Sequence, residues 1–199
     1  YVYKNHIRMS LVTSVYNCNG AVVTMISGHE VPGGIRQLAA IEYVRGLINA
    51  NPAVNEIVYA GPNTGLAQVA IAIAANTNGI TASVFVPSSY PPQPLSELAR
   101  EYGADLMLQK DLSAYSLEDL QDMAKKYVRG RGDRYLLPFG LKDPLFIELL
   151  TGAIRDNLPE EFQSGGISGS ISDSRIWVPC GSATLLKALA VVWPSAHFM

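Results

Sequence analysis

Three glycine-containing loops stand where short apolar segments give way to helical patterns, and they are the first candidates for chemistry. They span residues 32–37, 60–65 and 179–184. Backbone N–H groups at the beginning of a helix can face an anion, and the helix dipole favours negative charge there. The loops therefore predict a site for a phosphorylated small molecule.

The candidate binding residues in these loops are small or polar. They are Gly33, Gly34 and Arg36 in the first loop, Asn63, Thr64 and Gly65 in the second, and Cys180, Gly181, Ser182, Ala183 and Thr184 in the third. The third loop combines small residues, two hydroxyls and a helix beginning, which favours a phosphate cradle over a plain cap. Taken alone, the first loop is better interpreted as an ordinary glycine turn, and an Asn or Thr helix cap is an equal alternative for the second. No loop matches a P-loop or the dinucleotide fingerprint, so the prediction is phosphate and not a nucleotide.

Strand-like and helix-like segments alternate along the chain, and this order predicts how the loops are positioned. Strands are expected at residues 21–26, 57–60, 83–86, 106–108, 135–137 and 176–178. Helices are expected at residues 37–48, 66–75, 94–102, 117–128, 144–157 and 184–192, with Ser116 as the N-cap of the fourth. Such alternation predicts an α/β fold, a mainly parallel twisted sheet with helices on both faces in three layers. Ligands of such sheets bind beyond the carboxyl ends of the strands.

Composition narrows the class of protein. The chain has 199 residues, 48% of them hydrophobic, which suits a single domain over residues 1–199. The 15 basic and 17 acidic residues are scattered, so we expect no nucleic-acid contact. No apolar segment approaches the length that spans a bilayer, and Cys18 and Cys180 are interpreted as reduced thiols. We therefore expect a soluble, intracellular protein of the cytoplasm or an organelle matrix.

Two further segments are not expected to take part in binding or catalysis, and no metal site is predicted. Residues 164–174 are rich in Gly and Ser and are expected to form a flexible surface insertion. The Arg-Gly-Asp triplet at residues 131–133 is interpreted as a solvated turn. No spacing of His, Cys, Asp and Glu resembles a set of metal ligands.

Taken in order, the three loops resemble those of the tryptophan synthase β-like, or fold-type II, family of pyridoxal-phosphate enzymes. That family includes the threonine synthase, cysteine synthase and aminocyclopropane-carboxylate deaminase branches. Its members carry an early Gly-Gly-x-Lys-type motif, then a Ser/Gly/Asn loop beneath the cofactor ring, then a loop that holds the phosphate. The corresponding segments here are residues 32–37, 60–68 and 179–185. The resemblance implies pyridoxal phosphate as cofactor, lyase or deaminase chemistry on a small amino acid, and an incomplete fold-type II unit.

The chain departs from that family at one decisive position, because Arg36 stands where the family has its Schiff-base lysine. Arginine stays protonated and is a poor nucleophile, although it can hold a phosphate or a carboxylate. Either Asn63 or Gly65 is expected under the cofactor ring, and the catalytic residue is left unknown, with Lys142 as an outside candidate. Two hypotheses follow. One is an enzyme that uses a lysine from elsewhere; the other is a degenerate structural or binding subunit, in a homodimer or a larger protein assembly.

Overall fold

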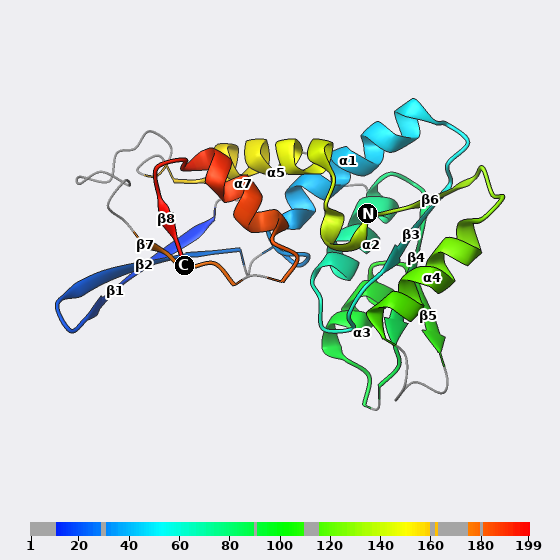
Figure 1. Ribbon diagram of the computed structural model, residues 1–199, viewed down its shortest axis with the longest axis horizontal. Helices are drawn as coiled ribbons and strands as arrows, with labels where there is room; N and C mark the ends of the chain where they lie inside the picture. The colour runs from blue at the N-terminus through cyan, green and yellow to red at the C-terminus, as the bar shows by residue number, and fades with distance from the viewer. Residues whose placement is uncertain are drawn as a thin grey trace.

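A four-stranded parallel sheet, in the spatial order β5-β4-β3-β6, lies on the right of the molecule in Figure 1. The computed structural model describes residues 11–28, 31–89, 91–109, 116–159, 162, 175–179 and 181–199. The strands of this sheet are β3 (Glu56–Ala60), β4 (Thr81–Pro87), β5 (Ala104–Gln109) and β6 (Arg134–Leu136). The helices are α1 (Arg36–Ala50), α2 (Ala67–Thr77), α3 (Pro94–Glu101), α4 (Leu117–Val128), α5 (Pro144–Asn157) and α7 (Thr184–Val192).

Side chains of β3 alternate between two cores, one on each face of the sheet. Ile57 and Tyr59 belong to the larger core, which contains the buried residues of α1, α2 and α5. Val58 and Ala60 belong to the smaller core under α4. Successive side chains of a strand point to opposite faces, so helices cover both faces of this sheet. The predicted α/β class with a parallel sheet is confirmed.

Helix positions agree closely with the sequence patterns. α4, α5 and α7 begin and end at the predicted residues, and the other three agree within two residues at each end. Ser116 is the predicted N-cap of α4: its hydroxyl accepts the N–H of Asp119 at 3.2 Å, and the Asp119 carboxylate accepts the N–H of Ser116 at 2.8 Å. In the described part of the chain, no helix has the length and apolar character needed to cross a membrane.

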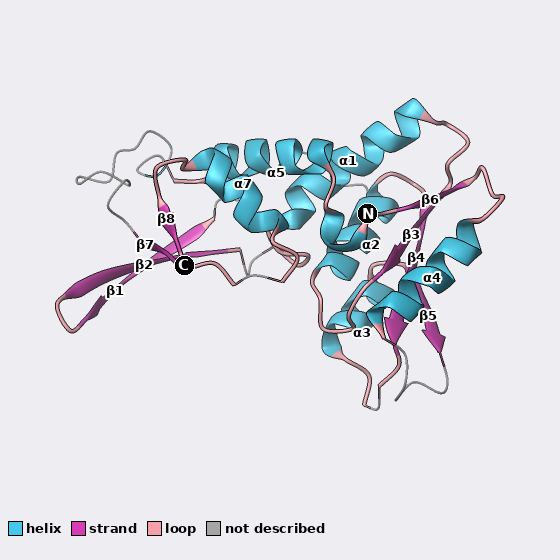
Figure 2. Cartoon of the chain, viewed as in Figure 1, coloured by secondary structure: helices cyan, strands magenta, loops and turns pink. Residues whose placement is uncertain are grey.

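The strand predicted at residues 21–26 is confirmed, but its expected burial in the main sheet is wrong, because it belongs to an exposed hairpin (Figure 2). β2 (Ala21–Ser27) pairs in antiparallel fashion with β1 (Val12–Cys18) and not with the main sheet. Asn19 and Gly20 join them with φ values of 50° and 84°, as the tight hairpin turns require. The Asn-Gly pair was the sequence signal for this hairpin.

The strand predicted at residues 176–178 also lies outside the main sheet. β7 (Arg175–Ile176) pairs with β8 (His197–Phe198) in a separate two-stranded parallel sheet. The Arg-Gly-Asp triplet is part of the connection between α4 and β6, with Arg131 and Gly132 exposed, as predicted. Cys18 is exposed and unpaired, whereas Cys180 and the predicted insertion at residues 164–174 lie outside the described residues.

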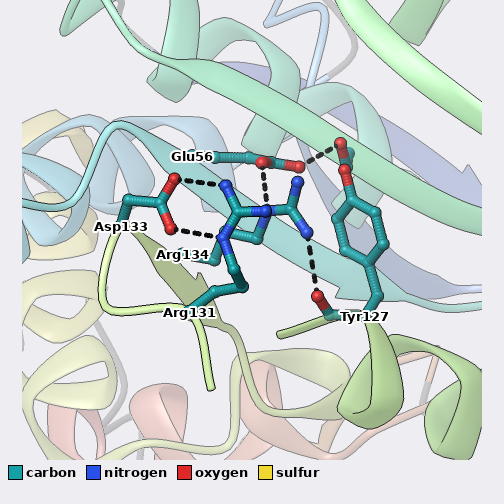
Figure 3. Close-up of polar contacts among 6 residues, drawn as sticks. Glu56, Tyr127, Arg131, Asp133 and Arg134 are labelled. Atoms are coloured by element: carbon teal, nitrogen blue, oxygen red, sulfur yellow. Dashed lines mark hydrogen bonds and ion pairs between the residues drawn. The ribbon is translucent and has the colours of Figure 1, made fainter. Parts of the chain in front are cut away.

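A nearly buried ion pair joins the amino ends of β3 and β6 (Figure 3). Arg134 Nε donates to Glu56 Oε2 at 2.7 Å, and the two side chains are 16% and 12% exposed. The guanidinium also donates to the carbonyl oxygen of Tyr127 at 2.9 Å and lies 3.8 Å from the centre of its ring. The other carboxylate oxygen of Glu56 accepts the Ser83 hydroxyl at 2.6 Å. One carboxylate and one guanidinium thereby connect β3, β4, β6 and α4.

Arg134→Met should reduce the free energy of unfolding by about 3 kcal/mol, because it leaves the Glu56 carboxylate largely buried without its partner. Urea denaturation of the purified protein measures this change. Arg131→Met is the matched control, since Arg131 pairs with Asp133 at the surface, where the side chains are 51% and 33% exposed. Its effect should be much smaller, because exposed ion pairs contribute little stability. Equal losses in the two variants would contradict the structural role of the buried pair.

Candidate functional site

The three glycine loops converge at the carboxyl end of the parallel sheet. β3 and β6 are adjacent and parallel, so Ala60 and Leu136, at which they end, lie at the same edge. The second loop leaves β3 there and leads into α2, while β6 leads into the short 3-10 turn η1 (Phe139–Leu141). The first and third loops reach this edge by close contacts with α2 and η1, described next.

The first loop packs directly on α2. A Cβ atom at Gly33 would lie 2.6 Å from the Cα atom of Ala70, so only glycine allows the two backbones to approach this closely. The N–H of Gly33 donates to the buried side-chain oxygen of Gln37 at 2.9 Å. Gln37 thus holds the loop against the first turn of its own helix, α1.

The third loop packs on Gly140 of η1. Thr184 Oγ1 donates to the Gly140 carbonyl oxygen at 2.6 Å, and Ser182 Oγ donates to the same oxygen at 3.4 Å. Gly140 has φ +65°, and a Cβ atom there would overlap the Ser182 side chain. The two hydroxyls predicted to cradle a phosphate therefore hold the loop against η1.

Tyr59 connects the first loop to the third across the end of β3. Burial raises the pKa of the Tyr59 hydroxyl, while its hydrogen bond with the Gly140 backbone and the positive charge of Arg36 oppose that rise. Both effects require Arg36 and Gly140 to lie close to this phenol. Arg36, from the first turn of α1, is thereby placed near the part of η1 on which Ser182 and Thr184 dock.

The three helices that follow the glycine loops begin without a side-chain cap. α1, α2 and α7 have no side-chain cap and no acidic residue in the first turn. α3 also has no side-chain cap, but Glu97 lies in its first turn. In contrast, α4 has its capping box with Ser116, and Asp143 caps α5 by accepting the N–H groups of Leu145 and Phe146. Uncapped helix beginnings carry a partial positive charge, and Arg36 adds a full one at the beginning of α1.

The second loop is held by a buried polar network that the sequence interpretation missed. Asn63 Nδ2 donates to the Pro87 carbonyl oxygen at 3.2 Å, which ties the loop to the end of β4. Gln68 Nε2 donates to the carbonyl oxygen of Asn63 at 2.8 Å, and Ser96 Oγ donates to Gln68 Oε1 at 3.2 Å. Gln68 is fully buried in the alanine-rich helix α2. A polar residue within an apolar run is the feature of the sequence that could have revealed this network.

The structure thus brings together Gly33, Gly34, Arg36, Ser182, Ala183 and Thr184 with the second loop at one edge. Asn63 uses its side chain to anchor that loop, and Thr64 is exposed. Cys180 lies outside the described residues. The ligand-binding role of every predicted residue, Gly65 and Gly181 included, stays a prediction.

Several solved structures have an architecture similar to that of this chain. The matches include a threonine deaminase from T.th., with a TM-score of 0.65, 19% identity, and coverage of 96% of this chain and 58% of that one. Diaminopropionate ammonia lyase from Escherichia coli has a TM-score of 0.71 at 12% identity, covering 99% and 57%. A pyridoxal 5'-phosphate-dependent aspartate racemase has a TM-score of 0.68 at 14% identity, covering 94% and 56%. The chain has the tryptophan synthase β-like fold.

This tryptophan synthase β-like chain spans little more than half the length of those three proteins. No family model matches its sequence, and no curated protein is similar to it. The resemblance predicted from the three loops is confirmed for the fold. At these levels of identity, the likeness carries no reaction from one protein to another.

Gly140→Ala should displace the third loop, because the added methyl group overlaps the Ser182 side chain. Gly130→Ala is the matched control: Gly130 has a similar φ of +73°, but nothing lies within 4 Å of an added Cβ atom. The control should lose about 1 kcal/mol of unfolding free energy from backbone strain alone. Gly140→Ala should lose about 1 to 3 kcal/mol more, from overpacking. Chemical denaturation of both variants measures the difference, and equal losses would contradict the close docking of the third loop.

Proposed function

We propose that this tryptophan synthase β-like protein binds a phosphorylated small molecule of the pyridoxal-phosphate type, and that it does so without a covalent bond at position 36. The observation that carries the proposal is that the three helices following the glycine loops begin without caps, with Arg36 at the beginning of α1 and near Tyr59 at the end of β3. The fold supports the choice of ligand, because one matched protein is by its name pyridoxal 5'-phosphate-dependent.

A phosphate group suits this edge on electrostatic grounds. The first turns of α1, α2 and α7 offer N–H donors and lack acidic side chains that would repel an anion. Arg36 adds a permanent positive charge and a planar set of donors that match phosphate oxygens. The hydroxyls of Ser182 and Thr184 keep the third loop rigid, so little conformational entropy is lost when the anion binds.

The same residues do not fit covalent attachment of pyridoxal phosphate. When bound, this cofactor supplies an electron sink for chemistry on amino acids, and the family attaches it through a lysine. Arg36 cannot lose its proton at ordinary pH and so cannot act as that amine. Among the described lysines, Lys142 follows η1 most closely, and it lines a neighbouring cavity on the α4 side of the sheet.

Two functions are compatible with this proposal, and the arginine at position 36 favours the first of them. Arg36 at the lysine position supports a binding or structural subunit that has lost the chemistry, acting in a homodimer or a larger assembly. The alternative is an active lyase or deaminase on a small amino acid, which requires another lysine, with Lys142 as the candidate. Each outcome has a distinct signature in the experiment below.

The purified chain should bind pyridoxal phosphate reversibly, and inorganic phosphate should compete. Pyridoxal, which has the same ring without the phosphate, is the matched control ligand and should bind far more weakly. Absorption titration measures binding, and borohydride reduction followed by peptide mapping detects any covalent adduct. A binding subunit gives no trapped lysine, whereas an adduct confined to Lys142 indicates the enzyme. Equal binding of pyridoxal and pyridoxal phosphate would refute the phosphate site.

Arg36→Lys should convert reversible binding into covalent attachment, because it places an amine that can lose its proton at the family position. Borohydride should then trap an adduct at position 36, with a new visible absorption band before reduction. Arg36→Met, the neutral control of similar length, should show no adduct and should bind pyridoxal phosphate about tenfold more weakly, because a charge-assisted contact is lost. Unchanged affinity in Arg36→Met would remove Arg36 from the site.

A further inference from the structure

A cavity lies at the carboxyl ends of β3 and β6, next to α4. It has a volume of about 440 Å³ and is bounded by the ends of β3 and β6, the turn η1 and the helix α4. Ala60, Leu137, Pro138 and Phe139 form an apolar wall, and the polar lining comes from Gln121, Lys125, Tyr135, Lys142 and Asp143. A volume of this size is within the range of small-molecule pockets, which combine an apolar wall with a few polar groups.

Two ammonium groups from different elements line this one cavity. Lys125 comes from α4, and Lys142 comes from the connection between η1 and α5. Lys125 pairs with Asp122 at 2.8 Å, but both side chains are about 60% exposed, and such surface pairs contribute little stability and exchange readily. The lining carboxylate, Asp143, already accepts the N–H groups of Leu145 and Phe146 through Oδ1. The lining therefore carries two ammonium groups and one carboxylate.

A buried phenol lies next to this lining. The Tyr43 side chain is buried in the larger core. Burial raises the pKa of Tyr43, and its interactions with Asp143 and Tyr135 raise it further, so the hydroxyl stays protonated and both of these cavity residues lie near it. Asp143 is thereby held from the core side, through Tyr43, and from α5, whose first N–H groups it accepts.

We propose that this cavity is a second binding site, for a small aliphatic carboxylate. The ammonium groups of Lys125 and Lys142 bind the carboxylate, with the Gln121 amide as a further donor. The apolar wall from Ala60 to Phe139 packs against the carbon chain, which favours an organic acid over an inorganic anion. The site is distinct from the one proposed around Arg36, because neither Arg36 nor Tyr59 lines this cavity.

Butyrate is the probe for this site, and its neutral amide, butyramide, is the matched control ligand. Butyrate added to the isotope-labelled chain should give saturable shifts of the backbone amide signals of Gln121, Tyr135 and Lys142 in NMR spectra. Butyramide should not, and inorganic phosphate should bind at least about tenfold more weakly at these residues, because it makes no apolar contact. Absence of saturable shifts, or equal binding of phosphate, would overturn the proposal.

The double variant Lys125→Met, Lys142→Met should weaken butyrate binding at least tenfold, and it should fold normally because both side chains are exposed. Lys126→Met is the matched control, since Lys126 neighbours Lys125 on α4 but faces a different hollow, lined by Phe85, Met107, Met123 and Tyr127. It should leave binding unchanged. Arg36→Met should also leave it unchanged, which separates this cavity from the phosphate site. Equal losses in the Lys126 variant or the Arg36 variant would overturn the assignment.

Discussion

The close approach of backbone segments at Gly33 and Gly140 is the constraint on which the site depends. Gly33 lets the first loop lie on α2, and Gly140 lets the third loop lie on η1. Any side chain at either position would separate elements that are far apart in the sequence. Because Tyr59 lies between Arg36 and Gly140, these two contacts gather all three loops at the end of β3.

The helices differ in how they begin. α4 and α5 do not follow a glycine loop, and side chains accept their first-turn N–H groups, although α5 begins only a few residues after Gly140. α1, α2 and α7 follow the three glycine loops and have no such caps. α3 also has no side-chain cap, but Glu97 lies in its first turn. A helix beginning without a cap loses stability unless something else supplies an acceptor, and in the proposed site the anion is that acceptor.

The buried ion pair and the two proposed binding sites lie at opposite ends of the same sheet. Glu56 is the first residue of β3 and Arg134 is the first residue of β6, so their ion pair fastens the amino ends of these strands. Both proposed sites lie at the carboxyl ends, where the connecting loops determine which side chains meet. Fastening the strands at one end leaves the loops at the other end free to specialise, as in other parallel-sheet proteins.

The sequence by itself determined the parallel α/β class, the helices and the three glycine loops, because hydrophobic periodicity and capping act over a few residues. The placing of Arg36 at the family's lysine position stays a prediction. For residues 21–26 the sequence predicted the strand but not its exposure, because the Asn-Gly turn that makes a separate hairpin was not given its weight. Only the tertiary structure showed that Ser182 and Thr184 use their hydroxyls on Gly140, that Tyr59 links the loops, and that Lys125 and Lys142 line one cavity. These contacts join residues far apart in the chain, and their geometry is decided by packing, which local patterns do not encode.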